Sequence, residues 1–379
     1  MEVRNILYLA DPNSLHDTKW ISFFSSKGVS KCYLLPRRLH YKTFKHAASQ
    51  LDSNTLVLSP ISDFSIVRFY RTLYEAYIIR RIILKYKIEV VHVLYAEPNA
   101  LWCLFRGFFS VPMIISARGT DVLKTIPEAF LKRDILNKIV AFAYKKAFQL
   151  ADWVTVTSQT QLDSVSRFSG RMDRLTVIRT GVDVGRLHED TSQHFPLRDS
   201  KPFILFPRYL KPLYNHEFSL SAIALLPSNI KMSYKMVFVG KGSGEPLYER
   251  LMEELMQVQS DVDFEFIAKQ SQEAIVELYK RTRLVVMVPV SDGSPVSGME
   301  ALLCGAKLIL GPLNYDPDIF SQAIKLKDWN INELAQAITQ AVEDSIGKPE
   351  LTTEMKLLMD RNYNMQRMQD IYKMVCKDA

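Results

Sequence analysis

The 379-residue sequence contains only four cysteines, and nothing in their spacing pairs them. Cys32, Cys103, Cys304 and Cys376 are far apart, with no C-x-x-C motif and no histidine at metal-ligand spacing. Disulfide-rich secreted domains and zinc sites both need closely spaced cysteines. The sequence therefore predicts neither a disulfide framework nor a zinc site, and it fits a reducing cytoplasm.

The sequence also lacks a hydrophobic run long enough to cross a bilayer. Its most apolar stretch, residues 100–116, is interrupted by Arg106, Gly107 and Pro112, whereas a membrane-spanning helix needs about 20 apolar residues in a row. The first residues show neither the basic start nor the small-residue cleavage site of a signal peptide, and they predict a buried strand instead. We expect a chain that does not cross the membrane and is not secreted.

The length and the pattern of apolar runs predict two α/β domains. Domains usually have roughly 100–200 residues, and 47% of this chain is hydrophobic. Short apolar runs bounded by Gly, Pro, Asp or Ser alternate with helix-like segments, which is typical of parallel sheets covered by helices. The predicted strands are residues 5–9, 31–35, 55–58, 90–94, 113–116, 153–157 and 175–178 in the first half, and 203–206, 235–239, 263–267, 284–289 and 307–310 in the second.

The polar stretch 186–201 has no periodic apolar face and is the predicted linker. We therefore expect a first domain over residues 1–190 and a second over 191–355. Two helices are predicted near the end, over 330–342 and 351–377, and residues 356–379 are expected to pack back on the first domain.

The basic charge is concentrated in the first half of the chain. Residues 1–190 contain 27 Lys and Arg against 17 Asp and Glu, and those between residues 68 and 146 are interleaved with aromatic and aliphatic residues. One interpretation is a surface that binds an anionic membrane, and another is a set of solvated helix faces. Nucleic acid is not expected as a partner, because no nucleic-acid-binding motif accompanies the charge.

The most informative segment is residues 289–310, where a predicted strand is followed by a loop and then a helix of good helix formers. Ligands of open α/β sheets sit at the carboxyl ends of strands, where loop amides and a helix N-terminus attract anions. A diphosphate would bind here. Asp292 and Glu300 flank the loop eight residues apart, and their carboxylates can accept hydrogen bonds from vicinal hydroxyls. A helix cap plus a surface glutamate is the alternative.

This segment resembles family 4 of the retaining glycosyltransferases, whose pattern is E-G-x6-E-A-x3-G; Asp292, Gly293, Glu300, Ala301 and Gly305 match it, with Asp in the first acidic place. The resemblance implies a GT-B fold, in which two Rossmann-like domains face each other across a deep cleft. It also implies that Glu300 binds the ribose of the donor nucleotide and that Asp292 binds the donor sugar. The backbone of Gly293, Ser294, Pro295 and Val296 would face the sugar and the diphosphate.

Further donor-domain motifs of the family occur in the same order. Arg208, after the strand 203–206, is expected to bind the diphosphate, and with Asp292 and Glu300 it completes the predicted catalytic set. The family's lysine is replaced by Leu213, and Lys211 is the candidate substitute. The resemblance also implies a Gly-rich turn at Gly240 and Gly242 and contacts to the nucleobase from Ala268 and Lys269.

The first domain resembles the acceptor domain of the same family. A histidine commonly precedes its Gly-x-Asp triplet, but this sequence has Arg118 before Gly119 and Asp121. Arginine does not take up a proton, so no catalytic base is assigned there. Asn13, His16, Arg118 and Asp121 are the predicted acceptor-side residues, with capping roles as the alternative for His16 and Asp121.

The resemblance implies a retaining, metal-independent hexosyltransferase of bacterial polysaccharide or lipopolysaccharide biosynthesis. It would move a sugar from a nucleoside diphosphate sugar, UDP- or GDP-linked, to a hydroxyl of a glycan or glycolipid, with no bound cofactor. The expected location is the cytoplasm, peripheral on the inner face of the membrane. A non-catalytic sugar-nucleotide-binding relative and a hydrolysing sugar-nucleotide epimerase on the same fold are the alternatives.

Overall fold

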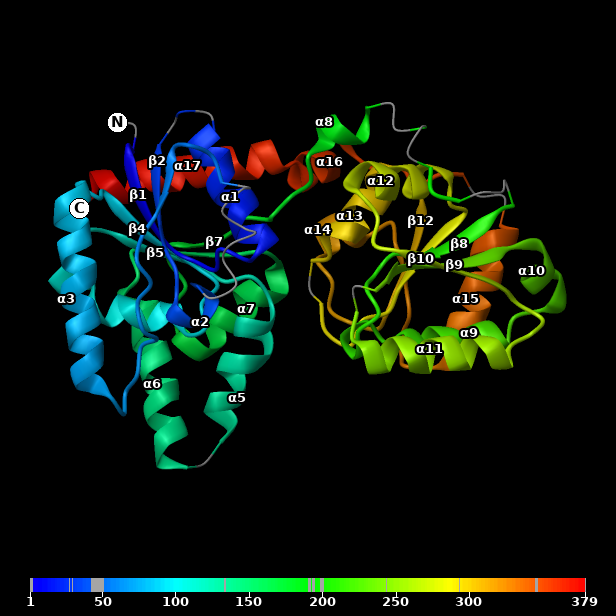
Figure 1. Ribbon diagram of the computed structural model, residues 1–379, viewed down its shortest axis with the longest axis horizontal. Coiled ribbons are helices and arrows are strands. Elements are labelled where there is room, and N and C mark those ends of the chain that lie inside the picture. Colours follow the sequence, from blue (N-terminus) through cyan, green and yellow to red (C-terminus); the bar gives the residue numbers. More distant parts are fainter. Residues whose placement is uncertain are drawn as a thin grey trace. The chain divides into compact units, whose positions relative to one another are not determined.

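The computed structural model describes residues 3–26, 28, 30–41, 51–132, 134–189, 192, 195–197, 201–242, 244–292, 294–344 and 347–378. The chain forms two compact units (Figure 1): unit 1 combines Met1–Thr180 with Asn362–Ala379, and unit 2 is Gly181–Arg361. The acceptor-binding domain over 1–190 and the donor-binding domain over 191–355 stay predictions. The predicted linker 186–201 lies partly outside the described residues.

Unit 1 is built on a seven-stranded parallel sheet in the order β3-β2-β1-β4-β5-β6-β7. The strands are β1 Asn5–Leu9, β2 Lys31–Leu35, β3 Thr55–Val57, β4 Val90–Leu94, β5 Met113–Ser116, β6 Trp153–Val156 and β7 Leu175–Val177. The helices are α1 Leu15–Ser26, α2 Arg38–Tyr41, α3 Phe69–Tyr86, η3 Asn99–Phe105, α4 Arg106–Phe109, η4 Asp121–Thr125, α5 Ile126–Leu131, α6 Ile135–Leu150, α7 Gln159–Ser169 and the C-terminal α17 Arg361–Lys377.

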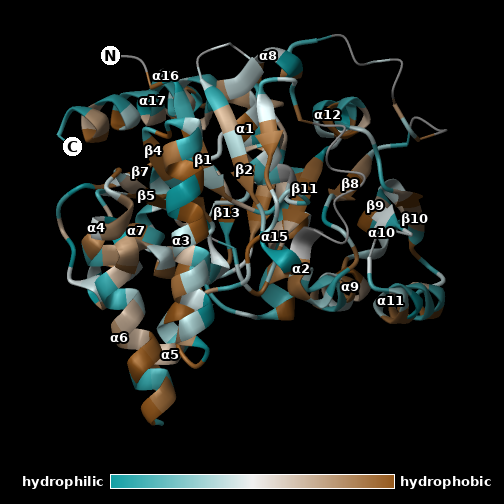
Figure 2. Ribbon diagram, turned by 60° about the vertical axis from the view of Figure 1, so that its left-hand side comes forward, coloured by the Kyte–Doolittle hydropathy of each residue, from teal (hydrophilic) through white to brown (hydrophobic). Residues whose placement is uncertain are grey.

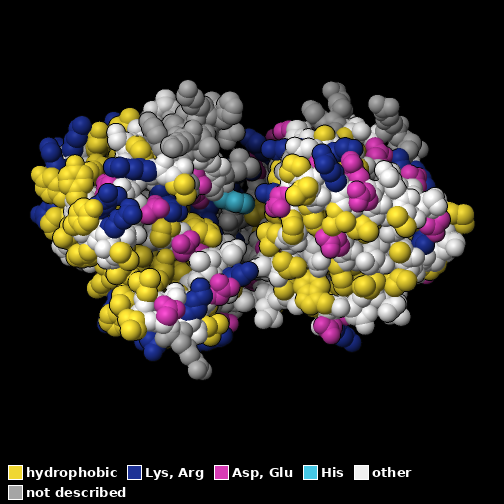
Figure 3. Space-filling model, turned by 60° about the horizontal axis from the view of Figure 1, so that its bottom comes forward, with side chains coloured by type: hydrophobic (Ala, Val, Ile, Leu, Met, Phe, Trp, Pro, Cys, Tyr) yellow, Lys and Arg dark blue, Asp and Glu magenta, His cyan; other side chains and the backbone are white. Residues whose placement is uncertain are grey.

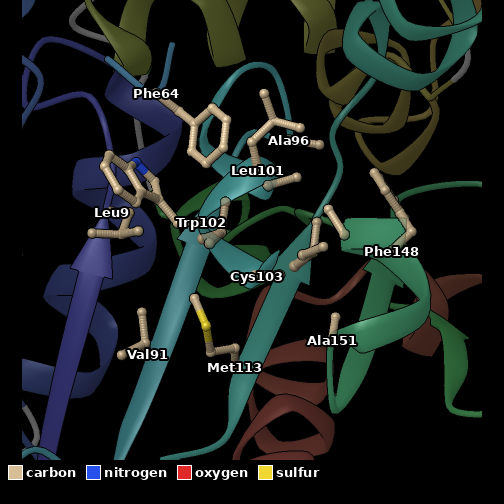
Figure 4. Close-up of a cluster of buried hydrophobic side chains, with 14 of the residues drawn as sticks. Leu9, Phe64, Val91, Ala96, Leu101, Trp102, Cys103, Met113, Phe148 and Ala151 are labelled. Atoms are coloured by element: carbon tan, nitrogen blue, oxygen red, sulfur yellow. The ribbon is translucent and has the colours of Figure 1, made fainter. Parts of the chain in front are cut away.

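The strands of unit 1 are mostly apolar because both faces of the sheet are covered. Leu7 and Leu9 of β1 join one buried cluster, and Ile6 and Tyr8, which point to the opposite face, join another. Figure 4 shows the first cluster, in which Trp102 of η3 lies among side chains of the strands and the following helices. Strands buried on both faces lack polar alternation, which is why short apolar runs predicted them.

Unit 2 is a six-stranded parallel sheet in the order β10-β9-β8-β11-β12-β13. Its strands are β8 Phe203–Phe206, β9 Lys235–Lys241, β10 Asp263–Ala268, β11 Leu284–Met287, β12 Lys307–Leu310 and β13 Ile324–Lys325. Its helices are α8 Val184–Leu187, η6 Pro212–Tyr214, α9 His216–Ala224, α10 Ser228–Ser233, α11 Pro246–Val258, α12 Gln272–Arg281, α13 Val296–Leu303, α14 Pro317–Phe320, α15 Ile331–Glu343 and α16 Thr353–Met359.

The predicted two-domain α/β fold is confirmed, and two details of the prediction were wrong. β13 was not predicted, because a two-residue exposed edge strand leaves no apolar run in the sequence. The helix predicted over 351–377 is two helices, α16 and α17, separated at Asp360, whose backbone is extended. None of the helices in the described part of the chain is both long and apolar enough to span a membrane.

Helix α17 completes the core of unit 1 through a buried polar network. The Tyr372 hydroxyl lies 3.1 Å from the Tyr8 hydroxyl and 2.5 Å from His92 Nδ1. His92 Nε2 lies 2.7 Å from Ser116 Oγ, which also contacts the hydroxyl of Thr155. Burial holds the pKa of His92 well below its usual value. The network therefore ties the last helix to β1, β4, β5 and β6.

We predict that Tyr372→Phe lowers the stability of unit 1 by about 1–3 kcal/mol, because it leaves His92 Nδ1 buried without this partner. The measurement is hydrogen exchange of the β4 amides, which reports the local free energy of opening. Tyr363→Phe on the same helix, where the ring is only half-buried, is the control and should change that energy by less than about 0.5 kcal/mol. Equal protection of β4 in both variants would contradict the role given to the network.

Candidate functional site

The predicted donor residues of unit 2 lie where its strand order changes direction. β8 and β11 are neighbours in the sheet, and the chain continues to β9 and β10 on one side and to β12 and β13 on the other. Loops that follow two such strands diverge and leave a crevice at their carboxyl ends, the usual ligand site of open α/β sheets. Arg208 follows β8, and Asp292 follows β11.

Arg208 is held just beyond the carboxyl end of β8 by three groups from the surrounding loops. Its Nη2 lies 3.1 Å from Asp292 Oδ2, and its Nη1 donates to Ser297 Oγ at 2.6 Å. The guanidinium carbon lies 4.3 Å from the centre of the Tyr214 ring. The side chains of Arg208 and Asp292 are 21% and 18% exposed. A planar cation is thus fixed in a partly desolvated position, where its field acts more strongly on a bound anion than it would in water.

The loop that carries Asp292 leads directly into the N-terminus of α13. Asp292 Oδ1 accepts a hydrogen bond from the Ser294 amide at 3.3 Å. Pro295 occupies the N-cap position and supplies no side-chain cap, so the first amides of α13, beginning at Val296, present a partial positive charge. Gly293, the remaining predicted residue of this loop, lies outside the described residues.

Glu300 is half-buried in α13, and its carboxylate has a defined partner. Its Oε1 accepts a hydrogen bond from Gln272 Nε2 at 2.8 Å. Gln272 begins α12, and Ser271 caps that helix by accepting from the Ala274 amide. Gln272 was not predicted as a site residue, because a glutamine in the first turn of a helix carries no signal of its own.

The Gly-rich turn after β9 packs against the residue that follows Arg208. Gly240 has φ +106°, and a Cβ at this position would lie 2.7 Å from Tyr209 Cδ1. Gly242 has φ +77°, and its amide donates to Glu249 Oε2 at 3.0 Å. The amide of Gly244 donates to the other carboxylate oxygen at 2.7 Å. Both glycines thus have a structural reason to be glycine, and their contact with a nucleotide stays a prediction.

The remaining predicted donor residues follow β8 or lie at the end of β10. Ala268 ends β10 where the strand register shifts, and its carbonyl accepts from the Gln270 side chain at 2.8 Å. The Lys269 ammonium lies 5.9 Å from the centre of the Tyr209 ring. Lys211 is half-buried immediately before η6. The carboxyl ends of β8, β9 and β10 therefore bring these residues to one edge of the sheet.

His216 packs against the loop after β8 and contacts its backbone. Its Nε2 lies 3.1 Å from the Tyr209 carbonyl oxygen, and its backbone amide donates to the Tyr248 hydroxyl at 3.1 Å. Burial lowers the pKa of His216 from 6.5 to about 4. The imidazole is therefore neutral at pH 7 and braces the segment that contains Arg208.

In unit 1, Asp121 organises the loops at the carboxyl ends of β4 and β5. Its fully buried carboxylate accepts hydrogen bonds from the amides of Ala96 at 2.8 Å, Gly119 at 2.9 Å, Val122 at 3.0 Å and Arg118 at 3.2 Å. Burial raises the pKa of this carboxyl, against the opposing effect of the amides. Asp121 therefore shapes the loops, and the prediction that it also meets an acceptor is untested.

Arg118 lies on these loops and forms a buried ion pair. Its Nη1 is 3.2 Å from Asp17 Oδ1, with side-chain exposures of 9% and 4%. Its guanidinium carbon lies 4.8 Å from the centre of the Trp20 ring. Asn13 and His16 are exposed in the loop after β1 and in the first turn of α1. The four predicted acceptor-side residues thus follow β1 and β5 in unit 1, where Arg118 supplies a permanent positive charge.

In the part of the chain that the structure describes, no group of three or more His, Cys, Asp or Glu side chains is arranged to hold a metal ion. Arg208 and the N-terminus of α13 in unit 2, and Arg118 in unit 1, supply positive charge at the carboxyl ends of the strands.

Two protein-family models match the chain. Residues 188–356 match the model of glycosyl transferases group 1, and residues 5–156 match the model described as glycosyl transferase 4-like. No curated protein matches the chain significantly in sequence.

Solved structures are similar over nearly the whole chain at low sequence identity. A glycosyltransferase from Rickettsia africae has a TM-score of 0.73 and 15% identity, covering 100% of both chains. Sucrose-phosphate synthase from Thermosynechococcus elongatus has a TM-score of 0.72 and 13% identity, covering 99% of this chain and 100% of its own. Anabaena HepE in complex with UDP has a TM-score of 0.66 and 15% identity, covering 99% and 98%. These likenesses establish the fold.

We predict that His216 makes the stability of unit 2 fall as the pH is lowered. The unfolded histidine takes up a proton near pH 6.5, whereas the folded one stays neutral down to about pH 4, so stability is lost between these values. Between pH 7.5 and 5, wild type should lose about 2 kcal/mol more than His216→Gln. The measurement is hydrogen exchange of the β8 amides, corrected for intrinsic rates, with His188→Gln, at an exposed histidine, as the control. The same pH slope in wild type and His216→Gln would refute the prediction.

Proposed function

We propose that this chain, a glycosyltransferase with the GT-B fold, is a retaining enzyme that transfers a sugar from a nucleoside diphosphate sugar to a hydroxyl of a glycan or glycolipid. The observation that carries the proposal is the Arg208–Asp292 pair beside the N-terminus of α13, at the strand switch of unit 2. The two family matches support the reaction class. The complexes of HepE with UDP and with UDP-glucose support a UDP sugar as the first donor to test, with GDP sugars next.

In the proposed donor complex, Arg208 and the first amides of α13 bind the diphosphate. Asp292 keeps its ion pair with Arg208 while that arginine also binds the diphosphate, and the Asp292 carboxylate accepts hydrogen bonds from the transferred sugar. Glu300 accepts hydrogen bonds from the ribose hydroxyls while Gln272 fixes its orientation. The backbone near Gly293, Ser294 and Pro295 faces the sugar.

The more distant residues of the proposed site bind the rest of the nucleotide. The backbone of Ala268 and Lys269 binds the base. Gly240 and Gly242 let the neighbouring turn approach the nucleotide closely. Lys211 adds charge near the diphosphate.

The proposed chemistry breaks the bond between the anomeric carbon and the diphosphate oxygen and forms a bond from the same carbon to the acceptor oxygen on the same face. The acceptor proton passes to the departing diphosphate. Charge therefore develops on the leaving group, and a preorganised arginine and helix N-terminus stabilise it without rearrangement. We propose that no metal ion is required, because Arg208 and α13 supply this positive charge.

On the acceptor side, Asn13, His16 and Arg118 are proposed to position the acceptor, with Asp121 holding their loops. Arg118 replaces a group that could accept a proton, which agrees with a mechanism in which the leaving phosphate is the base. We propose a bacterial polysaccharide or lipopolysaccharide as the product and a cytoplasmic protein on the inner face of the membrane as the setting.

The proposal is tested by screening UDP and GDP sugars for thermal stabilisation of the protein and then for transfer to glycan and glycolipid acceptors.

We predict that Glu300→Ala weakens donor binding at least about 10-fold. The substitution removes hydrogen bonds between the ribose and a charged carboxylate, and such bonds contribute about 1.5–3 kcal/mol of binding free energy. Gln272→Ala should weaken donor binding less, and Glu254→Ala, at an exposed glutamate of α11, is the control.

NMR of the product of sugar transfer should show the same anomeric configuration as the donor. Inversion at that carbon, or interconversion of free nucleotide sugars without an acceptor, would overturn the proposal.

We also predict that Arg208→Lys lowers kcat by about 100-fold or more while the Kd for UDP rises much less. Lysine keeps the charge but loses the planar fork that contacts two partners at once, and removal of one preorganised donor at a developing anion typically costs a factor of about 100–1000. Steady-state kinetics and calorimetric titration with UDP separate the two effects. An unchanged kcat with a large loss of UDP affinity would show that Arg208 binds only the ground state.

A further inference from the structure

Helix α3 of unit 1 exposes an apolar, aromatic face to solvent. Tyr70, Leu73, Tyr74 and Tyr77, which follow one another at helical spacing, are 68%, 49%, 63% and 52% exposed. The opposite face, with Ala76, Ile79 and Ile83, is packed in the core. A helix on a protein surface normally places polar residues on its outer face, so this stripe indicates a surface that is covered in use.

Helix α6 exposes a second apolar face near its N-terminal end. Ile135, Leu136, Ile139 and Phe142 are 78%, 51%, 46% and 60% exposed. Figure 2 shows hydrophobic residues at the free end of α6. We call the exposed residues of α3 and α6 together the α3/α6 surface.

The charges on the α3/α6 surface are almost all positive. α3 carries Arg71, Arg80, Arg81 and Lys85, and α6 carries Lys138, Lys145 and Lys146. The one acidic residue within α3, Glu75, is 3% exposed and accepts from the Ser62 amide and from Arg38. α6 contains no acidic residue. The nearby acids are Glu128 in α5 and the N-cap Asp134, which accepts from the Asn137 amide.

This mixture favours a bilayer over a protein partner. The cores of protein interfaces are depleted of lysine, whereas here the exposed Lys85, Lys138, Lys145 and Lys146 lie on the same two helices as the apolar residues. Long basic side chains can place their stems beside acyl chains and their charges among anionic headgroups. Tyrosines suit the same boundary because one end of the ring is apolar and the other is wet.

The exposed apolar residues of the α3/α6 surface lie at the end of unit 1 that contains the proposed acceptor-side residues. Helices α3 and α6 lead directly into the parallel strands β4 and β6, so they end at the amino edge of the sheet and begin toward the carboxyl edge, which carries the loops of Arg118 and Asp121. Figure 1 shows both helix ends at one end of unit 1. Figure 3, which turns this end toward the viewer, shows hydrophobic and basic side chains gathered on unit 1.

We infer that the α3/α6 surface docks unit 1 on an anionic lipid bilayer with its acceptor-binding edge next to the headgroups. This inference rests on the proposed function insofar as it makes a lipid-linked molecule the acceptor. The docking itself needs neither donor nor acceptor and is measured without them.

The test is co-sedimentation of the full-length protein with vesicles of phosphatidylcholine, with and without phosphatidylglycerol. Wild type should bind only the anionic vesicles, and less tightly as salt is raised. Arg71→Glu/Arg81→Glu/Lys138→Glu should lower the partition coefficient at least about 100-fold, since each basic residue contributes about five-fold. Ile135→Ser/Leu136→Ser/Phe142→Ser should lower it at least about 10-fold at low and high salt alike.

Matched variants of unit 2 serve as controls. Leu247→Ser/Val258→Ser removes apolar side chains that are 81% and 82% exposed, and Arg250→Glu/Lys327→Glu/Lys356→Glu reverses three exposed charges. Both should bind vesicles within about two-fold of wild type. Thermal stabilisation by the donor sugar should be unchanged in all four variants, so a failure of docking and a failure of the donor site are told apart. Equal binding of neutral and anionic vesicles would overturn the inference. So would a wild-type dimer that dissociates in the apolar variant while vesicle binding is unchanged.

Discussion

The ion pair between Arg208 and Asp292 joins the two loops on which the proposed donor site depends. These residues are distant in sequence and meet only because β8 and β11 are adjacent parallel strands whose chain continuations diverge. The pair fixes Arg208 next to the uncapped start of α13. Because both groups are partly desolvated, the positive charge is prepared before a diphosphate arrives, which is the condition for electrostatic stabilisation of a leaving group.

Unit 1 uses the same topology in a different way. Its order β3-β2-β1-β4-β5-β6-β7 also changes direction beside its first strand, and the loops there are held by the internal carboxylate of Asp121 and by the buried Arg118–Asp17 pair. The proposed acceptor side is thus shaped by the protein's own charges, while the proposed donor side leaves the first amides of α13 for a ligand. Helix α17 is joined to β4 of the same sheet by the contact between Tyr372 and His92.

The fold could be predicted because strands buried on both faces leave unmistakable apolar runs, such as residues 203–206, which form β8. β13, short and exposed, left none. The candidate site residues were predicted from motifs of local spacing, but their contacts were not, since Gln272 reaches Glu300 and Asp17 reaches Arg118 from separate elements. A sequence shows which residue types lie at a strand end; only packing decides which side chains pair.

The most direct measurement is a crystal structure of the protein with a nucleoside diphosphate bound. We expect the diphosphate between the Arg208 guanidinium and the amide of Val296, with the ribose hydroxyls on the Glu300 carboxylate and Gln272 still in contact with that carboxylate. A nucleotide bound elsewhere, with its diphosphate away from Arg208 and its ribose remote from Glu300, would contradict the proposed donor site.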